Sequence, residues 1–411
     1  MPISHFRSLR LCAKFIISYK FVISFLYLQV NAQLPSGSWH GGLQLNDTLE
    51  LPVIFTYETN KISIINGEEK ISVDEITYKA DSIFFRMPIF DAEFRCRFSG
   101  ESMTGFFYNH ARKNKNLIPF HAEHFSSIRT TDISNIPSLN ISGRYHVVFD
   151  GEDAESKDAV GLFTQNGNKL TGTFLTTTGD YRYLAGDVRG SRMWLSTFDG
   201  SHLFLFTALI KNDTLYNGEF FSGQHWHDTW TGWKDEHAKL LPADSLTFLK
   251  PGFDKMDFTF PDENGKNVSL SEDRFKNKAV IIQLMGTWCP NCMDETKFLS
   301  GWYNKNRKNN IEIIALDYER FLDTTTVNKN IRRLKKRFDI NYSVLFAGSA
   351  DKQEAALTLP MLNRVFAFPT TIFLNKDKKV VKIHTGFSGP ATGEEYEKFV
   401  QWFEGVIRKL E

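Results

Sequence analysis

The residues best suited to chemistry in this chain are Cys289 and Cys292, which are separated by Pro290 and Asn291. Two thiols at this spacing can perform thiol–disulfide exchange if one is held as a thiolate near neutral pH and the other resolves the mixed disulfide. A free cysteine has a pKa of about 8.5, and the start of a helix lowers this value by one to several units. The motif therefore predicts a redox-active dithiol, provided that a helix begins at Cys289.

The sequence around the motif predicts that helix start. An apolar run from Ala279 to Met285 is typical of a strand covered on both faces, and it ends just before the motif. Pro290 would occupy the first helical position, where its missing N–H costs nothing. The sulfur of Cys289 would then accept N–H groups of the first turn, at the positive end of the helix dipole. Cys292 would lie one turn further on the same face, so we predict Cys289 as the attacking thiol and Cys292 as the resolving thiol of a disulfide pair.

Two other common uses of a Cys-x-x-Cys motif lack their partners in this sequence. A structural zinc site needs a second ligand pair, and no other Cys-x-x-Cys or Cys-x-x-His occurs. Haem attachment needs a histidine after the second cysteine, where Met293 stands. Cys96 alternates with phenylalanines in a predicted strand, which favours a buried, inert side chain. No cofactor other than the redox-active disulfide is therefore expected.

Strands and helices alternate from Met256 to the C-terminus and predict a layered α/β domain with a mostly parallel sheet. A hairpin is expected at residues 257–261 and 266–270. The remaining expected elements are strands at 311–316, 342–346, 370–374 and 379–384, and helices after the motif, at 327–338, at 352–364 and at the C-terminus. The last helix shows an apolar stripe at helical spacing and a capping box at residues 392–395.

The segment GTWCPNCMDE, residues 286–295, resembles the active-site segment of the TlpA/ResA-type thioredoxin-like reductases, which are exported bacterial proteins of the redoxin (AhpC/TSA-related) superfamily. The resemblance covers about residue 256 to the C-terminus. It implies a thioredoxin fold, thiol–disulfide oxidoreductase activity and catalytic roles for Cys289, Cys292 and the adjacent Trp288. It also implies protein disulfides as substrates and an upstream thiol electron donor. A membrane-bound donor is one of the alternatives that the resemblance allows. The whole chain is similar to multi-domain members of this family from Bacteroidetes-type bacteria.

The same resemblance assigns Pro369 and Glu295. Phe368-Pro369-Thr370 resembles the family's cis-proline loop, so Pro369 is expected to face the disulfide with a cis peptide bond, which costs little before proline. Thioredoxin has a buried aspartate where this chain has Gln283, which cannot titrate. Glu295 matches the glutamate that ResA-like proteins use near their thiols, and burial would raise its pKa so that it exchanges the proton of Cys292. A solvated helix glutamate is the alternative.

Residues 34–236 show short alternating strands punctuated by Gly, Asn and Asp, and this pattern repeats itself. The echoed segments are Gly37-Ser38-Trp39 with Gly143-Arg144-Tyr145, Asn60-Lys61-Ile62 with Asn168-Lys169-Leu170, and Phe90-Asp91 with Phe198-Asp199. We predict two tandem β repeats, residues 34–125 and 138–236, each packed as a sandwich or closed into a barrel. A linker at 237–255 would join them to the thioredoxin-like domain, residues 256–411.

Residues 1–32 predict a signal peptide. Arg7, Arg10 and Lys14 precede an apolar run at residues 21–30, and small residues near Ala32 offer a cleavage site. The run is shorter than the roughly 20 residues that span a bilayer. We therefore expect export to the periplasm or cell envelope, with an uncleaved N-terminal anchor as the alternative. The formal net charge of +1 gives no indication of a nucleic-acid partner.

Two other functions stay open at this stage. Peroxiredoxins share this fold, and Thr287 near Cys289 suits a thiol peroxidase, although the Trp-Cys-Pro-x-Cys frame favours dithiol exchange. The β region would instead be a ligand- or metal-binding module if His225, His227 and Asp228 formed a metal site. Strand histidines beside tryptophans are more often packing partners. The sequence does not fix the substrate or the direction of electron flow.

Overall fold

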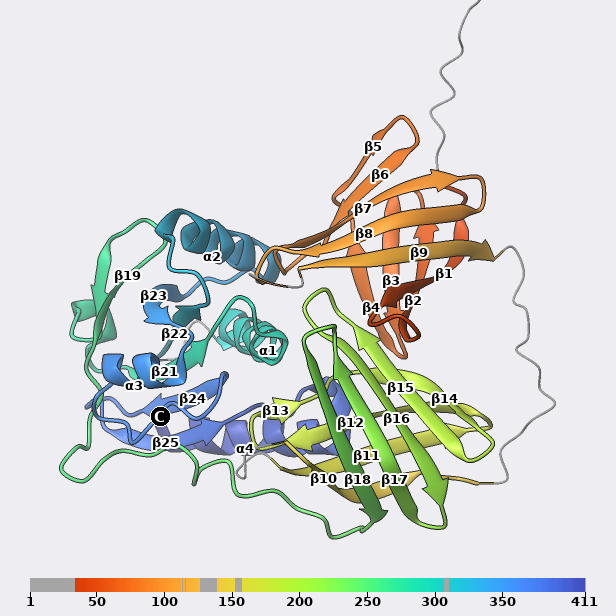
Figure 1. Cartoon of the computed structure of the whole chain (residues 1–411). Helices are drawn as coiled ribbons and strands as arrows, with labels where there is room; N and C mark the ends of the chain where they lie inside the picture. The colour runs from red at the N-terminus through yellow and green to blue at the C-terminus, as the bar shows by residue number, and fades with distance from the viewer. Residues whose placement is uncertain are drawn as a thin grey trace, which may run out of the picture. The chain divides into compact units, whose positions relative to one another are not determined.

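The computed structural model describes residues 34–112, 114, 116–125, 139–151, 157–306 and 310–410 (Figure 1). Within them, two nine-stranded sheets precede an α/β domain with a five-stranded sheet, so the predicted fold class is confirmed. From Leu34 onward, the described residues form one compact unit. The predicted signal peptide, residues 1–32, lies outside the described residues. No helix in the described part of the chain is both long and apolar enough to cross a membrane.

The first β repeat is an antiparallel sheet with two free edges. Its order is β4-β3-β2-β1-β9-β8-β7-β6-β5, and β4 does not pair with β5. Alternation of apolar and polar residues gives each strand one buried face; in β7, Phe94 and Cys96 are buried while Arg95 and Arg97 are exposed, as predicted for Cys96. The strands are β1 (Gly37–Gln44), β2 (Glu50–Glu58), β3 (Lys61–Asn66), β4 (Glu69–Val73), β5 (Ile76–Lys79), β6 (Ser82–Arg86), β7 (Ala92–Ser99), β8 (Ser102–Asn109) and β9 (Leu117–Phe125).

The second β repeat closes on itself. β10, β11, β12, β14, β15, β16, β17 and β18 pair in a ring because β12 pairs with β14 and β18 returns to β10, while the short β13 pairs only with β12. Aromatic side chains such as Phe174, Phe206 and Trp230 are fully buried and fill its interior. The strands are β10 (Gly143–Phe149), β11 (Asp158–Asn166), β12 (Lys169–Thr176), β13 (Gly179–Asp180), β14 (Leu184–Arg189), β15 (Arg192–Phe198), β16 (Leu203–Lys211), β17 (Thr214–Ser222) and β18 (Trp226–Lys234).

The echoed sequence segments lie at corresponding places in the two sheets. Gly37 and Gly143 begin β1 and β10, with φ of 126° and 131°, and Lys61 and Lys169 begin β3 and β12. Each repeat therefore carries nine strands in the same order along the chain, which supports an origin by duplication. The two sheets also contact each other, because Phe198 of β15 packs edge-on against Phe94 and Phe107 of the first repeat.

The predicted linker, residues 237–255, contains no helix or strand of three or more residues. It nevertheless packs on the α/β domain. Leu246 is buried, its carbonyl accepts a hydrogen bond from Arg364, and the backbone N–H of Lys250 donates to Met361. The linker is thus fixed along the surface of the C-terminal domain.

The C-terminal sheet has the order β23-β22-β21-β24-β25, and the expectation of a mostly parallel sheet is wrong. β21–β22 and β22–β23 pair in parallel, whereas β21–β24 and β24–β25 pair antiparallel. β24 and β25 are joined by a short turn without a helix, and such a connection permits only antiparallel pairing. The strands are β19 (Thr259–Pro261) and β20 (Asn267–Ser269), which form the predicted hairpin, and β21 (Ala279–Met285), β22 (Ile311–Glu319), β23 (Ser343–Ser349), β24 (Thr370–Leu374) and β25 (Val380–Thr385).

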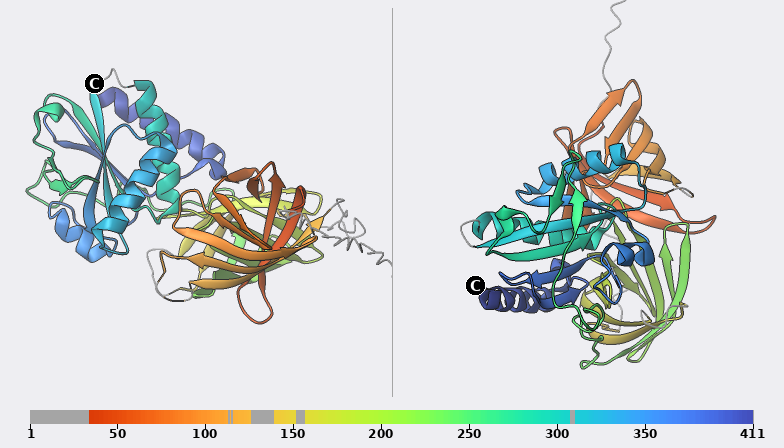
Figure 2. Two further views of the ribbon diagram at one scale, coloured as in Figure 1. Left: turned by 90° about the horizontal axis from the view of Figure 1, so that it is seen from above. Right: turned by 90° about the vertical axis from the view of Figure 1, so that its left-hand side faces the viewer.

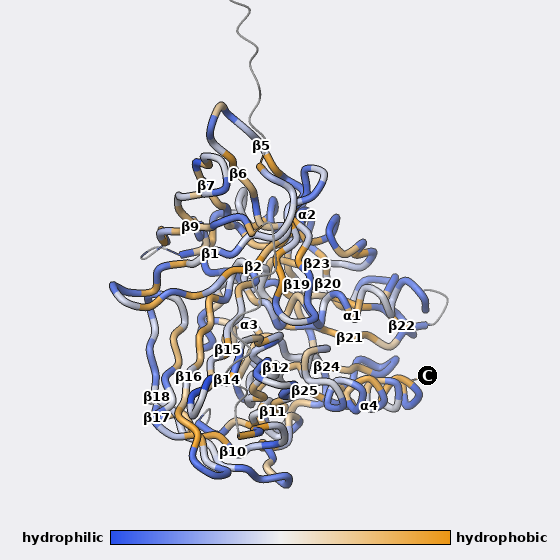
Figure 3. The backbone as a smooth tube through the Cα atoms, turned by 90° about the vertical axis from the view of Figure 1, so that its right-hand side faces the viewer, coloured by the Kyte–Doolittle hydropathy of each residue, from blue (hydrophilic) through white to orange (hydrophobic). Residues whose placement is uncertain are grey.

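Helices lie on both sides of this sheet (Figure 2). They are η1 (Asp273–Phe275), α1 (Pro290–Asn306), α2 (Thr324–Phe338), α3 (Lys352–Thr358), η2 (Pro390–Thr392) and α4 (Glu394–Leu410). Hydrophobic and hydrophilic residues alternate along the tube of α4 (Figure 3), and the helix buries the predicted stripe, including Phe399 and Phe403, against α1 and β24. α1 therefore packs against both α4, through Phe298, and the sheet, through Gln283 of β21.

Two helix boundaries differ from the predictions. α3 ends at Thr358 instead of residue 364, because Leu359 leaves the helical conformation directly before Pro360. The predicted capping box at residues 392–395 is absent: Thr392 ends a 3-10 turn and its hydroxyl donates to the carbonyl of Gly389. Gly393, with φ of 57°, directly precedes α4, and its carbonyl accepts from the N–H of Glu397.

Candidate active site

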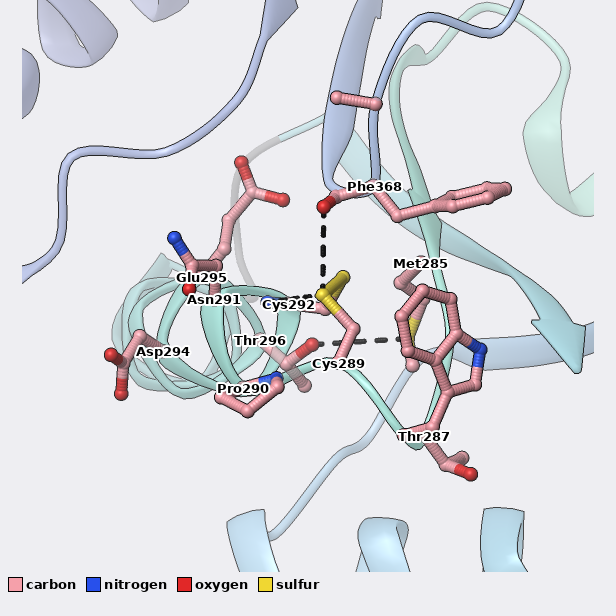
Figure 4. The surroundings of a disulfide bond; sticks show 12 residues. Met285, Thr287, Cys289, Pro290, Asn291, Cys292, Asp294, Glu295, Thr296 and Phe368 are labelled. Carbon is pink, nitrogen blue, oxygen red and sulfur yellow. Dashed lines mark hydrogen bonds between the residues drawn. A yellow bond between two sulfur atoms is a disulfide. The ribbon is translucent and has the colours of Figure 1, made fainter. Parts of the chain in front are cut away.

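Cys289 and Cys292 form a disulfide at the start of α1, with their Cα atoms 5.2 Å apart. β21 ends at Met285, and a tight turn places the N–H of Cys289 3.1 Å from the carbonyl of Gly286. Cys289 itself precedes the helix, because its carbonyl accepts the N–H of Met293 at 3.1 Å. Pro290 is therefore the first helical residue, as the sequence predicted (Figure 4).

The two sulfur atoms have different surroundings. Sγ of Cys289 lies 3.2 Å from the backbone nitrogen of Cys292, which donates to it, and it faces the first turn of a 17-residue helix. An N–H donor and a helix N-terminus both favour a negative charge on sulfur. Cys289 also lines a cavity of about 210 Å³. Cys292 has no exposed surface and lies among core residues.

The Phe368–Pro369 peptide bond is cis, as the resemblance implied, and it lies opposite the disulfide (Figure 4). The carbonyl oxygen of Phe368 is 3.5 Å from Sγ of Cys289. Trp288 completes this side of the site: its indole N–H donates to the carbonyl of Tyr318 at 2.9 Å, and its ring meets the ring of Phe368 edge-on. The structure thus brings Trp288 and the Pro369 loop to the cysteine that lines the cavity.

Glu295 is buried, so the alternative of a solvated helix glutamate is wrong. Its Oε2 accepts from Nε2 of Gln283 at 2.9 Å, and its Oε1 accepts from Oγ1 of Thr371 at 2.7 Å. Nε2 of Gln283 also lies 3.4 Å from the carbonyl oxygen of Cys292. Burial raises the pKa of Glu295 to about 7, although both hydrogen bonds act in the opposite direction. A carboxyl group with this pKa gains or loses its proton in the same pH range in which thiols take part in disulfide exchange.

A pair of carboxyl groups that the sequence prediction missed lies behind the turn. Thr287 donates its N–H to Oε1 of Glu319 at 2.9 Å, and its hydroxyl donates to the same oxygen. Burial, reinforced by repulsion from Glu319, raises the pKa of the neighbouring Asp317 well above its usual range. Both residues belong to the end of β22, which the sequence prediction had ended at Leu316. The sequence did offer an indication of this pair, because two acidic residues at alternate positions follow the apolar part of a strand, at the carboxyl end where sites form in α/β sheets.

The second β repeat contacts the active-site helix directly, which the sequence did not predict. Nδ2 of Asn291 donates to the carbonyl of Asp180 at 2.9 Å, and the hydroxyl of Ser201 donates to the carbonyl of Trp288 at 3.1 Å. The guanidinium of Arg182 donates to the carbonyl of Pro290 at 3.2 Å and pairs with Asp294. In Figure 4 Asp294 points away from the disulfide.

The candidate metal residues of the β region do not converge. His227, on β18, is bonded to Glu219 and stacked on Phe221, and His225 lies in the preceding turn, within 3.5 Å of the hydroxyl of Ser222. The described part of the chain contains no cluster of three or more His, Cys, Asp or Glu side chains suited to a metal ion.

Comparison with known proteins finds relatives of the C-terminal domain. Residues 252–399 match the Redoxin family model. The thiol-disulfide oxidoreductase ResA of Bacillus thuringiensis subsp. konkukian is 27% identical over 153 residues, 37% of this chain and 78% of the relative. The ResA of Bacillus anthracis is 29% identical over 162 residues, 39% of this chain and 79% of the relative.

Solved structures give weak overlaps with the whole chain. A putative thiol:disulfide interchange protein DsbE from Chlorobium tepidum has a TM-score of 0.29 and 16% identity, covering 38% of this chain and 98% of its own. A thiol-disulfide oxidoreductase from Bacteroides fragilis has a TM-score of 0.27 and 18% identity, covering 36% of this chain and 99% of its own.

The fold and the disulfide at the helix start define a thiol–disulfide oxidoreductase with a thioredoxin-like domain. More closely, its C-terminal part is a redoxin domain related to the ResA proteins, as the resemblance had indicated.

Proposed function

We propose that this enzyme is an exported reductase of protein disulfides, in which Cys289 is the nucleophile and Cys292 resolves the mixed disulfide. One observation carries this assignment: the sulfur of Cys289 borders a cavity and accepts an N–H at 3.2 Å, whereas Cys292 is fully buried. Only Cys289 is placed to meet a substrate from outside. The other sulfur is positioned to attack only its neighbour.

The proposed exchange consists of two displacements. The thiolate of Cys289 attacks one sulfur of the substrate disulfide, forms a mixed disulfide and releases the first substrate thiolate, which takes up a proton. The thiolate of Cys292 then attacks Sγ of Cys289, which re-forms the Cys289–Cys292 disulfide and releases the second substrate thiolate. Two electrons pass from the enzyme dithiol to the substrate. An upstream dithiol donor returns two electrons to the enzyme in the same manner.

Glu295 is proposed to hold the proton that Cys292 gives up. Its carboxyl group is buried beside the first turns of α1, and Gln283 bonds both to it and to the carbonyl of Cys292. With a pKa of about 7, it accepts a proton at the pH where the buried thiol must ionise. Glu295 is in this sense a proton acceptor, and Gln283 is a positioning residue.

Trp288 and Pro369 are proposed to shape the place where the substrate disulfide lies. Trp288 forms a wall beside Cys289, and Pro369 offers no N–H, so the backbone around it is available to a substrate strand. The carbonyl of Phe368, 3.5 Å from Sγ of Cys289, marks the side from which that strand would approach.

Insulin reduction by dithiothreitol tests the function. The full-length protein should accelerate precipitation of the insulin B chain, and Cys289→Ser should abolish the acceleration. Cys292→Ser should accumulate a mixed disulfide with the substrate. Cys96→Ala is the matched control, because Cys96 is buried in β7, apart from the disulfide, and burial raises the pKa of its thiol to about 12. Acceleration that persists in Cys289→Ser would rule out the assignment.

A thiol peroxidase is the competing function. Here the hydroxyl of Thr287 donates to Glu319, which engages it away from a bound peroxide. Stopped-flow mixing with hydrogen peroxide separates the two activities. A disulfide reductase should consume peroxide slowly, whereas rapid consumption that survives Cys292→Ser would favour the peroxidase.

The direction of electron flow and the cellular compartment of the protein are each tested by a separate measurement. Midpoint potentials across this fold span about −270 to −120 mV, and reductases lie at the negative end. Equilibration of Cys289–Cys292 with glutathione or dithiothreitol buffers should give a value near that end. Fractionation of the source cells should place the protein in the periplasm or cell envelope; a cytoplasmic location would overturn the proposal of export.

A further inference from the structure

The cavity at Cys289 is built by both parts of the chain. Its redoxin side includes Trp288, Cys289 and Phe368, and its β side includes Gly179 and Ser201. Its volume of about 210 Å³ is below the range of about 300–1,000 Å³ typical of small-molecule sites. It therefore has room for one side chain or for the end of a small molecule.

The β wall of this cavity is closely fitted to the active-site helix. A Cβ atom on Gly179 would lie 2.2 Å from Nδ2 of Asn291, so a larger residue there would displace the Asn291 amide. The carboxylate of Asp180 accepts the N–H of Gly389 at 2.6 Å, which joins the wall to the segment before α4. Ser201 and Asn291 add the hydrogen bonds described above. The wall is thus a fixed part of the site.

Two arginines give the cavity a positive lining. Arg112, from the first β repeat, is half-buried. Arg320, after β22, is exposed as a whole residue, and its guanidinium lies over the Trp288 ring, 4.0 Å from the ring centre. In the described part of the chain, neither forms an ion pair with a carboxylate within 4.0 Å. Loss of solvent, followed by repulsion from Arg112, lowers the pKa of Arg320 to about 10, and Glu319 opposes this shift. Both guanidinium groups remain charged at neutral pH.

One carboxylate, that of Asp180, also lines the cavity and offsets part of this charge, so the two arginines leave the lining with a net positive charge. Both carboxylate oxygens of Asp180 already accept backbone N–H groups, those of Arg182 and Gly389. His202 is turned toward Asp199, with 3.2 Å between Nδ1 and the carboxylate. The N-terminus of α1 adds its own partial positive charge. An incoming anion would therefore relieve the repulsion between the arginines and gain charge-assisted hydrogen bonds.

We propose that Arg112 and Arg320, together with the β wall, form a subsite for a carboxylate next to the substrate's disulfide. The preferred substrates are disulfides with an acidic group beside the half-cystine, either in a protein segment or in a small peptide thiol. This inference rests on Cys289 being the nucleophile. The arginines contact only the carboxylate, and the exchange of sulfur bonds proceeds as described above.

Rates of reduction of differently charged disulfides test the subsite. The reduced full-length protein is mixed with oxidised glutathione, which is anionic, with bis(2-hydroxyethyl) disulfide, which is neutral, and with cystamine, which is cationic. The second-order rate constant for oxidation of the reduced protein should be roughly tenfold larger with the anionic disulfide than with the neutral one, since one charge-assisted hydrogen bond is worth about that factor. This ratio should decline as ionic strength rises.

Variants assign that preference to particular residues. Arg112→Gln and Arg320→Gln should each lower the anionic-to-neutral ratio several-fold, and Arg112→Lys should restore part of it. Arg97→Gln is the charge-matched control, because Arg97 is exposed on β7 and does not line the cavity. A ratio near one in the wild type, or an equal loss in Arg97→Gln, would overturn the subsite. Failure of the wild type to reduce any of the three disulfides would instead overturn the proposed function.

A pair of cystine peptides distinguishes the two sources of the carboxylate. One carries Glu beside the half-cystine and the other carries Gln at the same place. An Arg112-dependent preference for the Glu peptide supports protein segments as substrates. A preference confined to oxidised glutathione supports small peptide thiols. Absence of both preferences contradicts the inference.

Discussion

Nε2 of Gln283 lies 2.9 Å from Oε2 of Glu295, and this hydrogen bond joins the central strand β21 to the active-site helix α1. Both side chains are buried, and the same amide approaches the carbonyl of Cys292. An uncharged amide can hold the carboxyl group in either protonation state by rotating its donor or its acceptor toward it. Gln283 therefore keeps Glu295 in place while leaving it free to titrate.

Replacing Glu295 by Gln should alter the pH profile of the exchange. The wild-type rate of resolution of the mixed disulfide should change with an inflection near pH 7, because the proton acceptor is ionised only above its pKa of about 7. Glu295→Gln should lose that inflection and slow the step by roughly 10²-fold, the lower limit for general base catalysis. Quenched-flow measurements between pH 5.5 and 9 check this. A slower rate with an unchanged inflection would assign the titration to another group.

The same substitution should change how stability depends on pH. The pKa of Glu295 rises from 4.5 in the unfolded chain to about 7 in the folded protein, so the folded state binds this proton more tightly. The contribution of this carboxyl group to the free energy of unfolding is complete below about pH 4.5 and is lost as the pH rises to about 7. Glu295→Gln should therefore gain up to about 3 kcal/mol relative to the wild type between pH 4.5 and pH 8.

Urea unfolding followed by tryptophan fluorescence measures this difference. The exposed Glu397 of α4 provides the control for the loss of a glutamate from the surface of the protein. Other titrating groups are shared by all three proteins and cancel in the comparison. If Glu295→Gln kept a constant offset from the wild type, its carboxyl group would have an ordinary pKa.

Local sequence patterns were sufficient for the redox centre because its geometry is local. Cys289, Pro290 and Cys292 lie within one helical turn, and β21 was identified at both ends from its apolar residues alone. The alternation of Phe94 and Cys96 placed that cysteine in a core for the same reason. Where the neighbours along the chain determine the environment, the sequence was informative.

The contacts of the β region escaped prediction because they join residues far apart in sequence. Arg182 pairs with Glu69, far before it in the sequence, and with Asp294, far after it. Nothing in the sequence near residue 182 distinguishes it from a surface arginine. Closure of the second sheet depends on pairing between β12 and β14, which the alternation of residues does not encode. The antiparallel direction of β24 was missed because an apolar strand has the same sequence pattern in either orientation.

Arg182 should be among the most important residues for stability. Its guanidinium is buried and pairs with Glu69, Asp199 and Asp294, whose attraction outweighs the loss of solvent and raises its pKa. Arg182→Met would leave the buried carboxylate of Asp199 and the partly buried carboxylates of Glu69 and Asp294 without their cation, at a cost of about 3–5 kcal/mol. Arg189→Met is the matched control: its partner Asp187 lies at the surface, and such pairs contribute about 0–1 kcal/mol. Urea unfolding compares the two, and equal losses would contradict the importance of the buried cluster.

The metal hypothesis for the β region has a direct test. His227 is occupied by Glu219, so the purified full-length protein should contain no stoichiometric zinc, nickel or copper by elemental analysis. Treatment with a chelator should leave its thermal midpoint unchanged. If the wild type contained one equivalent of metal and His227→Ala contained none, this expectation would be contradicted and the β region would have a metal-binding role.

Gly179 should be intolerant of a side chain, since the new Cβ would meet the amide group of Asn291. The φ of Gly179 is 144°, so strain contributes as well, and Gly348→Ala is the control because its φ is 127° but its nearest neighbour would be 3.8 Å away. Gly179→Ala should cost about 1–3 kcal/mol more than Gly348→Ala, through overpacking and the lost bond from Asn291 to Asp180. The clash is isolated by a double-mutant cycle, in which Gly179→Ala should be less destabilising when Asn291 is already Ala. Additive effects would mean that the wall of the cavity is held by other contacts.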